Sequence, residues 1–175
     1  IPNDKLYDVS AIYICDHKHV IKNNLFTNDG TEFNRPFGGI ESHGPEAEIS
    51  NNRIDNTGNA IYVVNNQSIE NGDVVKRNIH HNYCDGCNVF INFWPFDNFD
   101  PISNINIFSN TAKDVRYSAI RCTYNPNERV LGDIQNVHFY NNTISGMPHV
   151  FDNTEDNDTY TYSIFNIEGV GNISE

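Results

Sequence analysis

The chain of 175 residues is short of the amino acids from which helices are usually built. Leu occurs 3 times and Ala 5 times, which excludes a predominantly helical fold. There is no run of 18 apolar residues for a transmembrane helix, and no basic start followed by an apolar stretch marks a signal peptide. Because the first residues run straight into a strand-like stretch, we expect the chain to be a piece of a longer protein.

Positive charge is also scarce. Lys and Arg number 11 against 23 Asp and Glu, which gives a net charge of -12. This charge repels a phosphate backbone and an anionic membrane surface. We therefore expect no nucleic-acid partner and no membrane insertion.

The abundant residues are those of β-structure. Asn occurs 29 times, and Ile and Val together 32 times. The β-branched excess favours strands, and a hydrophobic fraction of 38% is enough for a core. At this length we expect one domain over residues 1–175.

A repeat of an apolar-alternating stretch followed by Asn runs along the chain. Its alignment predicts a first column of Asn24, Asn52, Asn78, Asn110 and Asn142, and a second of Asn28, Asn56, Asn82, Asp114 and Gly146. Asn side chains at equivalent turns can hydrogen-bond along a stack as a ladder, and Asn tolerates left-handed backbone. The repeat therefore predicts short parallel strands stacked coil on coil.

A second strand follows each repeat unit. Period two predicts an inward column of Ile12, Ile40, Ile61, Val89, Ile120 and Val150. The outward column is predicted as Tyr13, Glu41, Tyr62, Phe90, Arg121 and Phe151. We expect the coils to cover roughly residues 9–151, and an irregular segment, 152–175, to hold one more strand at 162–167.

The "NN-x-I-x-N" units and the "G/A-I-x-V" strands resemble the right-handed parallel β-helix of the pectate-lyase-like superfamily. That group includes polysaccharide lyases, polygalacturonases, sugar epimerases and bacteriophage tailspikes. The resemblance implies an all-β, single-stranded right-handed parallel β-helix, here of about six coils. Only "SHG" at 42–44 echoes a polygalacturonase motif, and the "DPH" of mannuronan epimerases is absent. The resemblance therefore favours a tailspike or depolymerase.

The outward face of the second strands is the predicted site, because aromatic rings stack on sugar rings and polar groups bind hydroxyls. The predicted substrate-binding residues are Tyr13, Tyr62, Phe90, Asn92, Trp94, Arg121 and Tyr124. Arg121 would suit an acidic sugar or would pair with loop acids. The alternative for the aromatics is that loops or a neighbouring subunit cover them.

Glu41 is the leading catalytic candidate, since aromatic neighbours would raise its pKa and favour a general acid. A glycoside hydrolase needs a second carboxylate, and Asp97 and Asp100 are the leading partners. His43 lies two residues from Glu41, about 6.8 Å along an extended strand, where it would orient a substrate or act as a base. The alternative is that Glu41 and His43 are solvated side chains without a role.

The four cysteines are expected to be buried and reduced. A zinc half-site at Cys84 and Cys87, or a disulfide between them, remains an alternative. We predict no metal site and no cofactor, with calcium possible at the acidic run 152–158, which is otherwise a solvated loop.

These observations predict a glycan-recognising and glycan-cleaving module of the tailspike type, which acts on a bacterial surface polysaccharide. A hydrolase is favoured over a lyase. Open coil ends need cover, which further chain, a cap or a trimer partner would supply. The resemblance to tailspikes implies a homotrimer in a virion tail. The alternatives are a secreted lyase or epimerase acting on uronate polymers, and a non-catalytic adhesin.

Overall fold

Three parallel sheets of six strands each make up the protein. The computed structural model describes residues 9–15, 18–28, 37–64, 75–94, 102–122, 134–146, 149–153, 165–167 and 173–174. Within these ranges every strand pairing is parallel. None of these residues belongs to a helix that is long and apolar enough to cross a membrane.

The chain visits the three sheets in rotation. Sheet A contains β1 (Val9–Ile14), β4 (Phe37–Ser42), β7 (Asn59–Val64), β10 (Val89–Trp94), β13 (Ser118–Cys122) and β16 (His149–Asn153). Sheet B contains β2 (Lys18–Lys22), β5 (Glu46–Ser50), β8 (Lys76–His80), β11 (Ile102–Phe108), β14 (Ile134–Tyr140) and β17 (Phe165–Ile167). Sheet C contains β3 (Leu25–Thr27), β6 (Arg53–Asp55), β9 (Tyr83–Asp85), β12 (Thr111–Lys113), β15 (Thr143–Ser145) and β18 (Ile173–Ser174).

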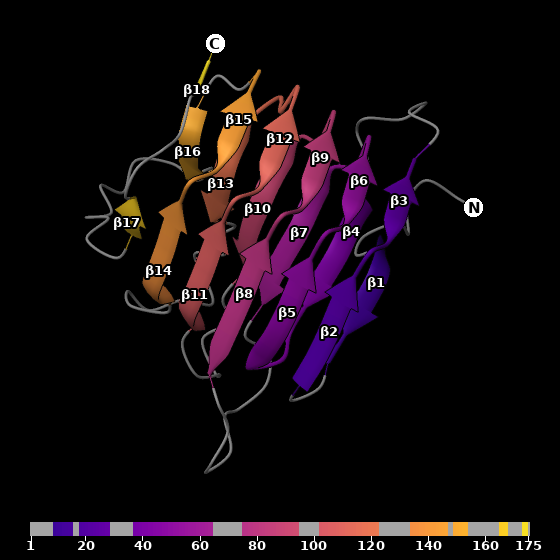
Figure 1. Cartoon of the computed structure of the whole chain (residues 1–175). Coiled ribbons are helices and arrows are strands. Elements are labelled where there is room, and N and C mark those ends of the chain that lie inside the picture. Colours follow the sequence, from indigo (N-terminus) through magenta and orange to yellow (C-terminus); the bar gives the residue numbers. More distant parts are fainter. Residues whose placement is uncertain are drawn as a thin grey trace.

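The winding is right-handed. In Figure 1 the chain ascends through sheets B and C at the front, descends through sheet A behind them, and steps from β1 toward β16 with each circuit. This confirms the predicted right-handed parallel β-helix. The strand expected at 162–167 is present in part, as β17.

Columns of apolar side chains from the three sheets form the core. In sheet A the column runs Ile12, Ile40, Ile61, Ile91 and Ile120, and Phe151 stands next in register. Sheet B contributes Ile21, Ile49, Ile79, Ile107 and Phe139. Sheet C contributes Phe26, Ile54, Cys84, Ala112 and Ile144. A single coil cannot bury its apolar face alone, and the neighbouring coils cover it.

The predicted sheet A column was wrong at two positions. Val89 pairs with Asn59 and Ser118, so Ile91 takes the place expected for Val89. The reason is that the turns from Asp55 to Asn59 and from Asp85 to Val89 have the same length. In the last strand Phe151, and not Val150, pairs with Ile120.

An asparagine ladder follows the turn between sheets B and C. It runs Asn24, Asn52, Asn82, Asn110 and Asn142. The Oδ1 atom of Asn82 accepts from the backbone N–H of Asn52 at 3.0 Å and from its Nδ2 at 3.0 Å. The Nδ2 atom of Asn82 donates to the carbonyl of Ile49 at 2.9 Å and to Oδ1 of Asn110 at 3.0 Å. Each inner amide is therefore satisfied by the coils on both sides.

One ladder position was predicted wrongly. Asn82 holds the place assigned to Asn78, so Gly86 and not Asn82 belongs to the second column. Asn78 instead lies on β8, where its Oδ1 accepts from Nδ2 of Asn106 at 3.1 Å. Both asparagines fit the sequence repeat, but only Asn82 follows a left-handed turn residue, His81, with a φ of 53°.

The cysteine expectation was also wrong for one pair. Cys84 and Cys87 form a disulfide with a Cα–Cα distance of 6.5 Å, and both residues are buried. Cys15 is a free thiol, as expected, but it is exposed and not buried.

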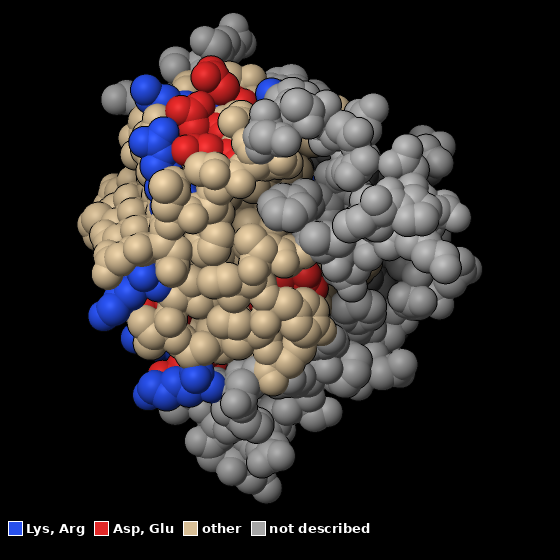
Figure 2. Space-filling view, turned by 90° about the vertical axis from the view of Figure 1, so that its right-hand side faces the viewer, with Lys and Arg blue, Asp and Glu red and all other residues tan. Residues whose placement is uncertain are grey.

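The first coil carries an exposed apolar surface. Its large exposed side chains are Tyr13, Val20 and Leu25. Figure 2 looks onto this end of the β-helix, where Lys and Arg side chains gather along the edge formed by sheets B and C. There β1, β2 and β3 are the edge strands of their sheets.

Removing an inner ladder amide should destabilise the fold more than removing an outer one. Asn82→Ala leaves the buried backbone N–H of Asn52 without its acceptor, and should lower the free energy of unfolding by about 2–4 kcal/mol. Asn24→Ala, at the half-buried end of the ladder, should cost about 1 kcal/mol. Urea unfolding of both variants measures the difference, and equal losses would contradict the ladder's role.

Candidate functional site

The outer column of sheet A carries the candidate site. Its register is Tyr13, Glu41, Tyr62, Asn92, Arg121 and Asp152, one residue from each successive strand. Glu41 therefore lies between Tyr13 and Tyr62 and three strands from Arg121, as the sequence predicted. Asn92 stands where Phe90 was expected.

Glu41 and His43 are in direct contact. Nε2 of His43 lies 2.6 Å from Oε1 of Glu41, and the hydroxyl of Ser10 donates to Oε2 of Glu41 at 2.7 Å. The sequence placed Glu41 and His43 on the same face but did not predict that their side chains would meet. They meet because residues two apart along an extended strand share one face, and the long Glu41 side chain reaches the His43 ring. Both carboxyl oxygens of Glu41 accept hydrogen bonds.

The pair is buried beneath an exposed aromatic ring. Glu41 is 3% exposed and His43 is 4% exposed, whereas Tyr13 is 53% exposed. The rings of Tyr13 and His43 have centroids 4.5 Å apart and are tilted by 47°. Tyr13 is therefore the member of the site that a ligand in solution reaches first.

Aromatic and amide groups continue the site along the next strands. The Tyr62 ring lies 6.2 Å from the Trp94 ring, and its hydroxyl accepts from Nδ2 of Asn59 at 2.6 Å. Nδ2 of Asn92 donates to Oδ1 of Asn59 at 3.3 Å. Asn59, like Ser10, was missed by the sequence analysis because it precedes the predicted strand. Tyr62 and Asn92 are buried and Trp94 is half-buried.

The structure places the predicted binding residue Phe90 elsewhere. Phe90 is fully buried in the hydrophobic core, so its assignment to substrate binding was wrong. In the last strand Asp152 takes the outer register position that was assigned to Phe151. Asp97, Asp100 and Tyr124 lie outside the described residues, as do residues 154–158 of the acidic run.

Arg77 supports the site from the inside. It occupies a core register position of β8, between Ala47 and Ile105, and is almost completely buried. Its Nε donates to the carbonyl of Gly44 at 2.7 Å. Its Nη2 donates to the carbonyls of Val64 at 3.0 Å and His43 at 3.4 Å.

Arg77 thereby fixes the backbone that carries His43. Burial lowers the pKa of Arg77 to about 10, so the guanidinium keeps its charge at neutral pH. Among the described residues, its hydrogen-bond partners are backbone carbonyls. The sequence signal for this role was its parity with the core residue Ile79, two positions later.

The site's chemistry is that of an acid–base pair next to stacking surfaces. A carboxylate joined to an imidazole can pass a proton between the two groups. Among the described residues no group of three or more His, Cys, Asp or Glu gathers as metal ligands. No family model, curated protein or solved structure matches the chain.

Replacing Arg77 should destabilise the protein. Arg77→Met removes three donors from buried carbonyls and should lower the free energy of unfolding by about 3 kcal/mol. Arg77→Lys should recover part of this loss, because an ammonium keeps the charge but lacks the planar fork. Arg53→Met, on the exposed face of sheet C, is the matched control and should change little. Guanidinium unfolding that gives equal midpoints for Arg77→Met and the parent would refute this role.

Proposed function

We propose that the outer face of sheet A binds a polysaccharide, and that Glu41 and His43 cleave it as an acid–base pair. The observation that carries this proposal is the hydrogen-bonded Glu41–His43 pair beneath the exposed ring of Tyr13. Aromatic rings can stack on sugar rings, and a hydrogen-bonded titratable pair can act in acid–base catalysis.

The column supplies the contacts that a sugar chain needs. Aromatic rings pack on the apolar faces of pyranose rings. Tyr13 on β1 is the exposed ring of the column, and beyond β4 the buried Tyr62 on β7 and the half-buried Trp94 on β10 continue it. Asn92 and Arg121 offer amide and guanidinium groups further along. Neighbouring strands lie about 4.8 Å apart, so a chain bound along the column would contact several coils.

Hydrolysis is the favoured reaction. Because Ser10 and His43 both contact the carboxyl oxygens of Glu41, Glu41 suits the role of base or nucleophile, with His43 taking up the proton. The second carboxylate of such a mechanism would come from Asp97 or Asp100. Uronate elimination is the alternative, in which Arg121 would neutralise the sugar carboxylate.

A non-catalytic adhesin is the second candidate function. The burial of Glu41 and His43 favours it, because a substrate must displace covering groups before it reaches the pair. In that case Tyr13 would bind the glycan and the pair would only hold the Tyr13 ring in place.

The setting we propose is a tailspike-type receptor-binding protein that acts on a bacterial surface polysaccharide as a homotrimer in a virion tail. The exposed apolar side chains of the first coil support a partner at that end, because such surfaces usually have one. A secreted polysaccharide lyase or epimerase is the alternative setting.

Glycan cleavage should depend on the pair and binding on Tyr13. In a screen of bacterial polysaccharides, Glu41→Gln should lower turnover at least about 100-fold and leave binding intact. Tyr13→Ala should weaken binding roughly 10-fold, because it removes the exposed ring. Mass analysis distinguishes new reducing ends from the unsaturated products of a lyase.

Glu46→Gln, which removes the ion pair with Lys18 on sheet B, is the control for both changes. If Glu41→Gln forms products at the parent rate, the assignment of Glu41 to catalysis is wrong. Binding without products from any variant would establish the adhesin.

A further inference from the structure

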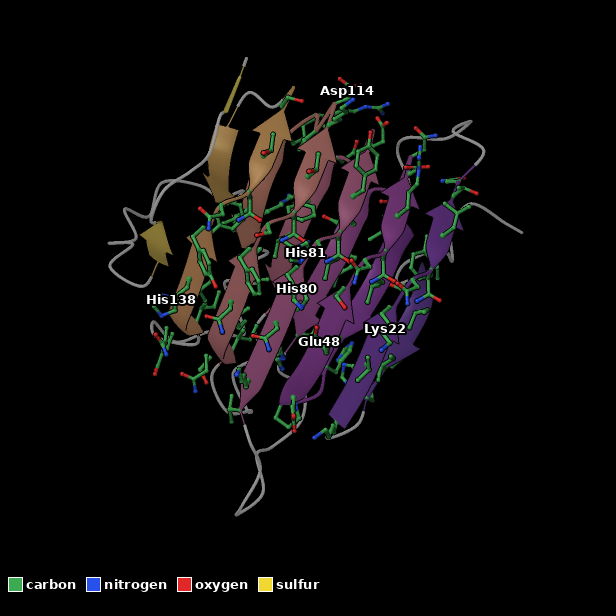
Figure 3. The ribbon with its side chains drawn as sticks, viewed as in Figure 1. Lys22, Glu48, His80, His81, Asp114 and His138 are labelled. Atoms are coloured by element: carbon green, nitrogen blue, oxygen red, sulfur yellow. A yellow bond between two sulfur atoms is a disulfide. The ribbon has the colours of Figure 1, made fainter. Side chains whose placement is uncertain are left out.

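Two imidazole nitrogens converge on the outer face of sheet B, away from the glycan site. His80 is the last residue of β8, and His81 occupies the turn that follows. Their Nδ1 atoms form a hydrogen bond of 2.8 Å, so a shared cation would replace the proton that now lies between them. Figure 3 shows Glu48, His80 and His81 together at the centre of this face, while His138 lies apart toward β14.

The spacing of the two nitrogens suits a shared cation. Imidazole nitrogens bind transition metals at about 2.0–2.1 Å. Two such ligands are about 2.9 Å apart at a right angle and about 3.4 Å apart at a tetrahedral angle, by simple trigonometry on those bond lengths. The observed 2.8 Å is closer to the right-angle value. Right-angle nitrogen ligands are typical of square-planar or tetragonal Cu²⁺ and Ni²⁺.

Glu48 contacts His80 in the way that carboxylates contact metal-binding histidines. Its Oε1 is hydrogen-bonded to Nε2 of His80. This bond places the proton of His80 on Nε2 and leaves the lone pair of Nδ1 directed at His81. A histidine that binds a metal almost always donates its other ring N–H to such a partner.

His80 is also held in place by stacking. Its ring lies on Phe108 at 4.7 Å with an interplanar angle of 15°, and Phe108 lies on Tyr140 at 5.2 Å and 5°. Phe108 meets the His81 ring edge-on at 6.2 Å. The neighbouring aromatic rings therefore fix the direction in which His80 presents Nδ1.

His81 stands at a turn position that is Asn in three of the five coils described. The residue before the ladder asparagine has a φ between 53° and 61° in every coil described, and it is Asn23, Asn51, His81, Ser109 or Asn141. Asn adopts this left-handed backbone more readily than His. The turn therefore fixes the backbone of His81, and this conformation brings the His81 ring to His80.

We propose that His80 and His81 bind a divalent transition-metal cation, with Cu²⁺ preferred, and that Glu48 orients His80. Two protein ligands leave the other positions to water, consistent with the absence of a third His, Cys, Asp or Glu ligand among the described residues. The site is therefore open and exchangeable. It takes a ligand of a different class from the glycan and is independent of the glycan site.

The test uses Cu²⁺ alone, titrated into the full chain by calorimetry and followed by electron paramagnetic resonance. All variants carry Cys15→Ser, because the exposed Cys15 thiol would otherwise react with the ion. The parent should bind one Cu²⁺ with nitrogen hyperfine structure from two imidazoles. His81→Asn should weaken binding at least about 10-fold while keeping the fold, because Asn occupies the same position in other coils.

Two further variants separate this proposal from its competitors. Glu48→Gln should weaken binding roughly 10–100-fold, as the loss of an orienting partner does. His138→Asn, on the same sheet but hydrogen-bonded to Asn136, should bind Cu²⁺ like the parent. Equal affinity in the parent and His81→Asn would overturn the proposal. So would a parent that binds no Cu²⁺, which would leave only a hydrogen bond between the two histidines.

Discussion

The asparagine ladder is the constraint on which the rest of the structure depends. Each inner amide accepts from one neighbouring coil and donates to both, and it does so where water is excluded. A coil that slipped by one residue would leave a buried amide unpaired and would turn its apolar side chains outward. The ladder therefore fixes the register of every coil that contributes to it.

Both surfaces of interest follow from that register. In sheet A the register brings Tyr13 over His43 and sets Glu41 between Tyr13 and Tyr62. In sheet B the same turn that presents Asn82 to the ladder forces its neighbour His81 into the left-handed conformation. The coils repeat one pattern of residues, and a local site can form where one coil carries a residue that differs from this pattern. Arg77 is such a residue, since it places a charge in a buried register position between Ala47 and Ile105.

The sequence was sufficient to predict the fold. The scarcity of Leu and Ala, the Ile and Val excess and the recurring Asn predicted a parallel β-helix, because each follows from stacking short strands around turns. The third repeat unit was misaligned because Asn78 and Asn82 lie four residues apart and both satisfy the repeat. Only the backbone conformation of His81 separates them.

The sequence predicted several residues of the outer face of sheet A, but it did not predict which of their side chains contact each other. Period two placed Glu41 and His43 on one face, at a distance set by an extended strand. The observed contact depends on the side-chain conformations of Glu41 and His43, which that spacing alone does not give. Phe90 was misplaced because the length of the turn before it, and not the apolar pattern, sets its register. The burial of the outer face of sheet A depends on how the whole chain packs, and a local sequence pattern does not predict this packing.

The central claim is that buried amides of the ladder hold the coils in register, and hydrogen exchange of backbone amides tests it most directly. The N–H groups of Asn52, Asn82 and Asn110 each donate to the Oδ1 of the next ladder asparagine. They should exchange only through global unfolding, with protection equal to that of the slowest strand amides. Exchange at the rate of exposed turn residues would contradict the account.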